Sequence, residues 1–136
     1  MSVYEDFQRS LYKFLAAKTG LTPFNFDAHA DLNELPAQDL VGLRDFSIES
    51  DHEMVIVETM IAISTIDDTN LFRLDGLIGS LFDTLSTDYE IGIYNSSNVK
   101  IASMKVMGQK AILPVVNTKI RPLKVIAISF ASGYTG

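Results

Sequence analysis

The longest apolar stretch of the chain runs from Glu53 to Ile66 and predicts a strand that is covered on both faces. A half-buried strand alternates apolar with polar residues, whereas this run is apolar in both alternating sets. The two sets are Val55, Val57, Ile61, Ile63 and Met54, Ile56, Met60, Ala62, Ile66. A buried helix is the rival interpretation, but the many β-branched residues favour a strand covered by its own chain or by a neighbouring subunit.

Two other stretches carry apolar residues at the spacing of a helix, residues 2–18 and residues 70–86. The first begins with an S-x-x-E capping box, and the second follows the capping residues of the sequence DDTN. Gly76 and Gly79 weaken the second helix, and we expect them to allow close packing on a sheet.

The remaining regular pattern is that of strands. Residues 40–49 and the central run form a predicted antiparallel hairpin over 40–66, with a bulge near Arg44 and Asp45. Gly108 is expected to end a later strand, and residues 131–136 are expected to fray. The further strands are predicted at 89–94, 99–107 and 123–130.

Residues 21–39 form a long acidic connection, which Phe24 and Phe26 are expected to pin to the body of the protein. Within it, Asp27, His29 and Asp31 resemble ligands of a hard cation. A metal site needs more ligands than these three supply, so a solvated loop is the favoured interpretation and no cofactor is predicted.

The segment 109–122 is apolar in its middle and basic at its ends, and it contains Pro114 and ends at Pro122. Proline does not fit a central strand, so we predict a projecting arm or an edge strand that contacts a partner. Burial in the core is the alternative. The predicted interface residues are Lys110, Ile112, Leu113, Val115, Lys119, Arg121 and Lys124.

The order α-β-β-α-β-β-arm-β predicts a single α+β domain over residues 1–136, with a mostly antiparallel sheet and two helices packed on one face. Two helices cover one side of a sheet, while the central and last strands are apolar on both sides. The second side therefore predicts an interface, and hence a homo-oligomer.

Charge is divided unevenly along the 136 residues, whose net charge is −6. All 17 acidic residues lie between Glu5 and Glu90, and six of the 11 Lys and Arg residues follow Glu90. Either the two parts neutralise each other within one fold, or the basic part meets the acidic part of another copy or another partner. With six cations and no interleaved aromatic residues before Phe130, the basic part does not predict specific nucleic-acid binding.

Candidate chemistry is sparse, and the sequence does not predict an enzyme. The chain has no cysteine and two histidines, and His52 at the predicted hairpin turn has no evident base or nucleophile beside it. The alternative function is a small-ligand-binding or regulatory α+β domain, for which Tyr89, Tyr94 and Glu58 are the suggestive residues. We expect no signal peptide and no membrane-spanning helix.

The layout resembles that of tail terminator and tail-completion (neck) proteins of long-tailed bacteriophages. The resemblance covers about residues 3–131, with an N-terminal helix, a long hairpin at 40–66, a second helix at 70–86 and further strands. It implies a structural virion protein, assembled in the host cytoplasm, that forms a ring, commonly of six copies. Such a ring caps the tail tube and meets the head–neck connector proteins.

Overall fold

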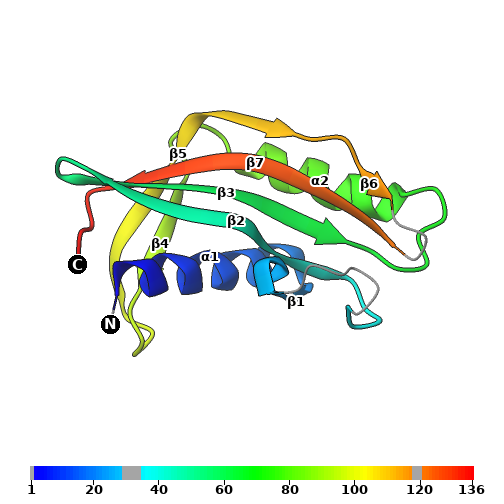
Figure 1. Ribbon diagram of the computed structural model, residues 1–136, viewed down its shortest axis with the longest axis horizontal. Coiled ribbons are helices and arrows are strands. Elements are labelled where there is room, and N and C mark those ends of the chain that lie inside the picture. Colours follow the sequence, from blue (N-terminus) through cyan, green and yellow to red (C-terminus); the bar gives the residue numbers. More distant parts are fainter. Residues whose placement is uncertain (1, 29–34, 118–120) are drawn as a thin grey trace.

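In the computed structural model, which describes residues 2–28, 35–117 and 121–136, a curved sheet lies over two helices (Figure 1). The helices are α1 (Val3–Thr19) and α2 (Phe72–Thr84), with a short 3-10 turn η1 (Phe26–Ala28). The strands are β1 (Thr22–Pro23), β2 (Leu40–Asp51), β3 (Met54–Ser64), β4 (Glu90–Tyr94), β5 (Lys100–Ile112), β6 (Val116–Asn117) and β7 (Pro122–Ser132).

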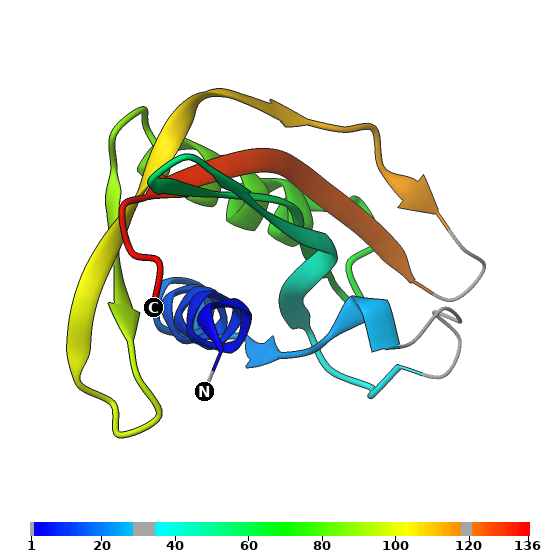
Figure 2. The same cartoon turned by 60° about the vertical axis from the view of Figure 1, so that its left-hand side comes forward.

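The described strands form one sheet in the order β1-β2-β3-β7-β5-β4, with β6 paired to β7. Every pairing is antiparallel except the short parallel contact between β1 and β2. The α+β class with a mostly antiparallel sheet is therefore confirmed. Figure 2 shows α1 nearly end-on beneath the arch of the sheet, so we call the helix-covered side the inner face and the opposite side the outer face.

Side-chain hydrogen bonds support the first turn of both helices, and a glycine ends the first helix. Ser2 Oγ accepts the N–H of Glu5 at 3.1 Å, and Gly20 ends α1 in the left-handed conformation with φ 71°. At the start of α2, Asp68 Oδ2 accepts the N–H of Leu74 at 2.8 Å. Both helices lie within one residue or two of their predicted bounds.

The β2–β3 hairpin contains the predicted bulge. Its register shifts between Arg44 and Ser47, and Asp45 adopts φ 53° at that point. Asp27 supports the bulge, because its carboxylate accepts the N–H of Asp45 at 2.7 Å and that of Phe46 at 3.3 Å.

The main core lies between the inner face and the two helices. Phe7, Leu11 and Leu15 of α1 and Leu74 and Ile78 of α2 are all fully or almost fully buried there. The sheet contributes Val41, Leu43, Phe46, Val55, Val57, Ile61, Ile63, Ile91, Ile93, Met104, Val106, Ile126, Ile128 and Phe130. The two helices therefore pack on one face of the sheet, as predicted.

A second, smaller cluster covers part of the outer face, and the chain itself supplies the cover. The buried members of this cluster are Phe26, Leu40, Ala62, Leu123 and Val125. Phe24, Leu35, Met60 and Leu113 pack against them. The apolar residues on the outer face of β3 and β7 are therefore covered in part by the chain itself. The prediction that Phe24 and Phe26 pin the connection to the body of the protein is confirmed.

The described part of 109–122 does not project as an arm, so that prediction is wrong for those residues. Gly108 does not end β5, which continues past a register shift between Val106 and Lys110 and pairs with β7 as far as Ile112. Farther along, β6 pairs with the start of β7. The segment is an edge of the sheet, the alternative that we gave for it; residues 118–120 lie outside the described ranges.

Candidate functional site

Part of the outer face is not covered by any described residue. It extends over β3, β7 and β5, and its largest side chains are Met54, which is 46 % exposed, and Met107, which is 38 % exposed. Ile56 of β3 and Ala131 of β7, which pair in register, are half-buried, as is Ala127, which lies farther along the same face opposite Met60. We call these five residues the outer strip. The alternating pattern of the central run predicted Met54 and Ile56, whereas Met107 and the two alanines of β7 gave no separate signal.

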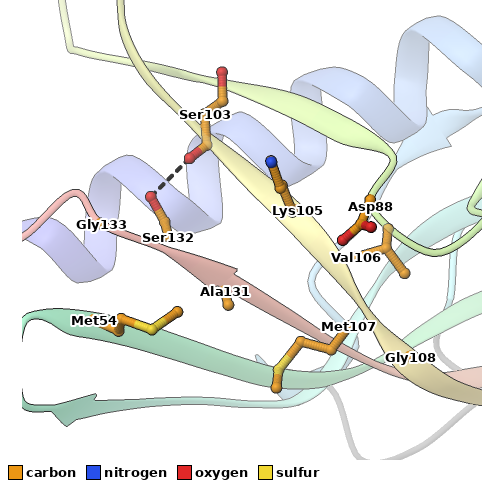
Figure 3. Close-up of a pocket in the computed structure, with 10 residues that line it drawn as sticks. All are labelled: Met54, Asp88, Ser103, Lys105, Val106, Met107, Gly108, Ala131, Ser132 and Gly133. Carbon is orange, nitrogen blue, oxygen red and sulfur yellow. Dashed lines mark hydrogen bonds between the residues drawn. The ribbon is translucent and has the colours of Figure 1, made fainter.

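The outer strip is hollowed between β5, the start of β3 and the end of β7 (Figure 3). The hollow has a volume of about 380 Å³ and is open to solvent along one side. Met54 and Met107 lie along one side of it, and Lys105 and Asp88 lie nearer the other. Ser132 donates its hydroxyl to Ser103 O at 2.7 Å, so that hydroxyl is engaged by the sheet itself.

Charged side chains border the outer strip on both sides. Lys105 lies 3.9 Å from Glu90 on the neighbouring strand, and both side chains are mostly exposed. On the other side, Glu49 pairs in register with Ile56. Exposed Glu58, which pairs with Ser129 of β7, lies within the strip and separates Ala127 from Ile56 and Ala131. Methionine suits apolar contact with another surface, and the charged border suits orientation of that contact.

Two of the predicted interface residues, Lys110 and Lys124, are held by α2 instead. Lys110 Nζ contacts the carbonyl oxygen of Phe82 and lies 3.9 Å from the centre of its ring. Lys124 Nζ lies 2.9 Å from Asp75 Oδ1. Both amines therefore fix the helix to the sheet, and their contact with a partner stays a prediction.

Arg121, another predicted interface residue, is buried with 3 % of its surface exposed. Its guanidinium donates to the carbonyl oxygens of Pro36, Gln38 and Ser64. Burial lowers the pKa of Arg121, and the nearby charge of Asp39 opposes that effect. The residue is an internal tie between the start of β7 and the 35–39 segment, and its contact with a partner stays a prediction that its burial does not support.

The apolar residues of the predicted interface divide between the two clusters and the surface. Leu113 packs on the second cluster, and Val115 packs on the main core. Ile112 is 38 % exposed at the edge of the sheet. Lys119 lies outside the described residues, so the prediction for it stays a prediction.

The residues considered for a ligand site do not converge. Tyr89 packs edge-to-face on Phe14, with 5.8 Å between ring centroids, and Tyr94 lies under the amine of Lys13. Glu58 is exposed on β3, which β7 and β5 separate from β4. His52 is at the hairpin turn, where its Nε2 lies 3.6 Å from Asp51 Oδ1.

The residues considered for a metal are only partly described. Asp27 is engaged at the bulge of β2, while His29 and Asp31 lie outside the described residues. Within residues 2–28, 35–117 and 121–136, no group of three His, Cys, Asp or Glu side chains is placed to hold a metal ion.

The sequence matches no protein-family model, and no curated protein matches it either. Neither described helix is long and apolar enough to cross a membrane.

Proposed function

We propose that the protein is a structural subunit that assembles with further copies of itself into a ring, as the resemblance to phage tail terminator and tail-completion proteins implies. The observation that carries this proposal is the outer strip, an uncovered apolar part of a sheet whose other face is already filled by two helices. Uncovered apolar surface of this kind is typical of association surfaces.

The resemblance also implies where the ring would lie in the virion. Its subunits cap the tail tube and meet the head–neck connector proteins, in a virion assembled in the host cytoplasm, with six copies as the common number. Contacts between unlike surfaces of successive copies close into a ring when the rotation between them allows it.

The charge division of the chain gives this proposal less support than the sequence suggested. Lys110, Lys124 and Arg121 are engaged within the fold, and Lys105 lies near Glu90. Two of these four cations, Lys105 and Lys124, lie beside carboxylates of the same chain, and the other two contact backbone carbonyl oxygens. The proposed association is therefore driven by apolar contact, with exposed charges at its border.

Size-exclusion chromatography with light scattering, over a wide range of protein concentration, tests the proposal. The unchanged protein should show a species larger than a monomer. The double variant Met54→Lys, Met107→Lys should shift it to the monomer, because two charges would lie in the contact. Phe72→Lys is the matched control: Phe72 is 79 % exposed on α2, so the change removes exposed apolar surface away from the outer strip.

Circular dichroism and thermal unfolding of each variant show whether the fold is retained. A protein that stays monomeric at millimolar concentration would exclude self-association and leave the alternative, a small-ligand-binding or regulatory domain. The open hollow beside Lys105 is where a ligand of that kind would be sought. Assembly that survives the double variant would move the contact away from the outer strip.

A further inference from the structure

The outer edge of β2 is occupied by the protein's own chain along its first half. Val41 O accepts the N–H of Phe24 at 2.9 Å, and the N–H of Leu43 lies 3.4 Å from the hydroxyl oxygen of Tyr12. At the bulge, Asp27 accepts the N–H of Phe46. Each of these backbone groups would otherwise be an open position at the edge of a sheet.

Beyond Phe46 this cover ends. Asp51 pairs with Met54 across a two-residue turn, and in such a hairpin this pair exchanges hydrogen bonds. The pairs then alternate, so the backbone groups of Ile48 and Ser50 point away from β3. No hydrogen bond joins these outward groups to any described residue. A free edge of four backbone groups therefore remains at the end of the hairpin, at the left in Figure 1.

The two sides of this free edge differ in chemistry. On the inner side, Tyr4 of α1 packs edge-to-face on Phe46 at 5.0 Å between centroids and is 41 % exposed. Ile48 is half-buried on the same side. On the outer side, the exposed carboxylates of Glu49 and Asp51 lie next to the edge.

We propose that the edge Ser47–Asp51 binds an extended segment of a partner protein as an added antiparallel or parallel strand, and that this segment alternates apolar residues with Lys or Arg. Successive side chains of an added strand point to opposite faces. The apolar set lies against Tyr4 and Ile48, and the basic set lies beside Glu49 and Asp51. Backbone hydrogen bonds to Ile48 and Ser50 hold the segment in place.

A second copy of this chain fits the edge less well than a separate basic partner. At the opposite end of the sheet the edge is formed by β4, which has no Lys or Arg, and by the part of β5 beyond Val106. The amine of Lys110 in that part of β5 is engaged with Phe82 of α2. Lys105, farther along β5, lies near Glu90. The described strands thus offer no free run of alternating apolar and basic residues, whereas a partner segment with that pattern meets both sides of the β2 edge.

The probe is a fluorescein-labelled octapeptide in which lysine alternates with valine, titrated with the intact protein and followed by fluorescence anisotropy. We expect binding that weakens as salt is raised. Ser50→Pro should lower the affinity at least tenfold, because it removes an outward N–H and blocks the edge. Proline is tolerated at a strand position whose N–H faces solvent, and Ser50→Ala, which keeps the N–H, should bind as the unchanged protein does.

Charge is tested separately with Glu49→Lys, which should also lower the affinity. Asp83→Lys is its matched control, since Asp83 is an exposed carboxylate on α2, away from the hairpin. Amide hydrogen exchange measured by NMR provides a readout that does not depend on the variants. On peptide binding, the N–H groups of Ile48 and Ser50 should become protected from exchange.

Four results would overturn the proposal. One is the absence of binding at millimolar peptide, and another is equal binding of a peptide with methylated backbone nitrogens. Protection at Lys110 and Ile112 in place of Ile48 and Ser50 would move the site to β5. Self-association of the free protein that Ser50→Pro abolishes and Met54→Lys, Met107→Lys does not would identify a second copy as the occupant of the edge.

Discussion

Arg121 Nε donates to Ser64 Oγ at 2.7 Å, and this bond joins the chain just before β7 to the last residue of β3. The same guanidinium reaches the carbonyl oxygens of Pro36 and Gln38, both at 2.7 Å. A single buried side chain therefore connects two strands and the segment that leads into β2. These oxygen acceptors satisfy the guanidinium, which is why a cation can be buried at an otherwise apolar end of the sheet.

Replacing Arg121 by Met should lower the free energy of unfolding by about 3 kcal/mol, because buried carbonyl groups lose charged donors. Urea unfolding at pH 7 measures the change. Lys124→Met is the control, since it removes a partly exposed ion pair with Asp75 and should cost less than about 1 kcal/mol. Equal losses for the two variants would contradict the role of Arg121 as an internal tie.

Gly42 is needed for the close approach of the 24–28 segment to β2. A Cβ built at this residue would lie 1.7 Å from Phe24 O, so Gly42→Ala must push the segment outward. We expect a loss of about 1–3 kcal/mol in the free energy of unfolding, as for other overpacked sites. Tyr and Phe near-UV circular dichroism should change with it.

Gly76→Ala on α2 is the opposite case. A Cβ at Gly76 or at Gly79 would have no atom within 4 Å, so neither glycine is required for helix packing on the sheet, contrary to our expectation. Alanine at position 76 should raise the free energy of unfolding by up to about 1 kcal/mol, because it favours the helix. A loss of stability on thermal unfolding would contradict this assignment.

Asp39 and Asp68 should make the protein sensitive to acid. Burial raises the pKa of Asp39, but hydrogen bonds from Arg73 and from the N–H of Ile66 outweigh it, so its pKa is lowered. Burial also raises the pKa of Asp68, but hydrogen bonds from the N–H of Leu74, the hydroxyl of Thr65 and the N–H of Arg73, with the charge of Arg73, together outweigh it, so its pKa is lowered. A lowered folded-state pKa stabilises the fold above the unfolded-state pKa of about 4, and this contribution is lost as the pH falls through the folded-state pKa.

Urea unfolding across pH 2–7 measures the effect. Asp68→Asn should lower stability at pH 7 and reduce the steepness of the loss below about pH 4, the ordinary range of a carboxyl group. If the variant loses stability with acid as steeply as the unchanged protein, other carboxylates control the transition.

Tyr134 joins the C-terminal residues to α1. We expected residues 131–136 to fray, but the chain is held in place at Tyr134. Its hydroxyl donates to Asp6 Oδ2 at 2.8 Å, and Asp6 is buried beside Arg9. The hydrogen bond to Asp6 raises the pKa of Tyr134. The raised folded-state pKa stabilises the fold below the unfolded-state pKa of about 10, and this contribution is lost as the pH rises through the folded-state pKa.

Tyr134→Phe should therefore lower the thermal midpoint at pH 7 by a few degrees and should remove part of the loss of stability in alkali. Differential scanning calorimetry at pH 7 and at pH 10.5 checks both effects. Tyr4→Phe is the matched control, because Tyr4 is an exposed tyrosine on α1, the helix that also carries Asp6. An equal change in both variants would show that the bond to Asp6 has no special part in stability.

Local features of the fold were predictable because they depend on neighbouring residues. The cap at Ser2, the bulge near Asp45 and the two amphipathic helices each follow from residues a few positions apart. Residues 123–130, apolar on both faces, likewise indicated an interior strand, and β7 lies between β3 and β5.

Features that depend on distant residues were missed. The positions of Arg121 and Lys110 are decided by Ser64 and Phe82, which charge patterning along the chain does not reveal. Gly108 gave the pattern of a strand end, but pairing with β7 carries β5 past it. The sequence predicted that the whole outer face would be uncovered. The 24–28 segment covers part of that face, and only the outer strip remains uncovered.

The strand order also has a consequence for how the polypeptide folds as it is synthesised. β7 leaves the ribosome after the six other described strands, yet it lies in the middle of the sheet and pairs with β3 from Val55 to Ser64. Until it is made, the nascent chain holds two separate hairpins, β2–β3 and β4–β5, and the most apolar strand has one unpaired side. Closure of the sheet is therefore a late, long-range event, which slows folding and prolongs dependence on chaperones.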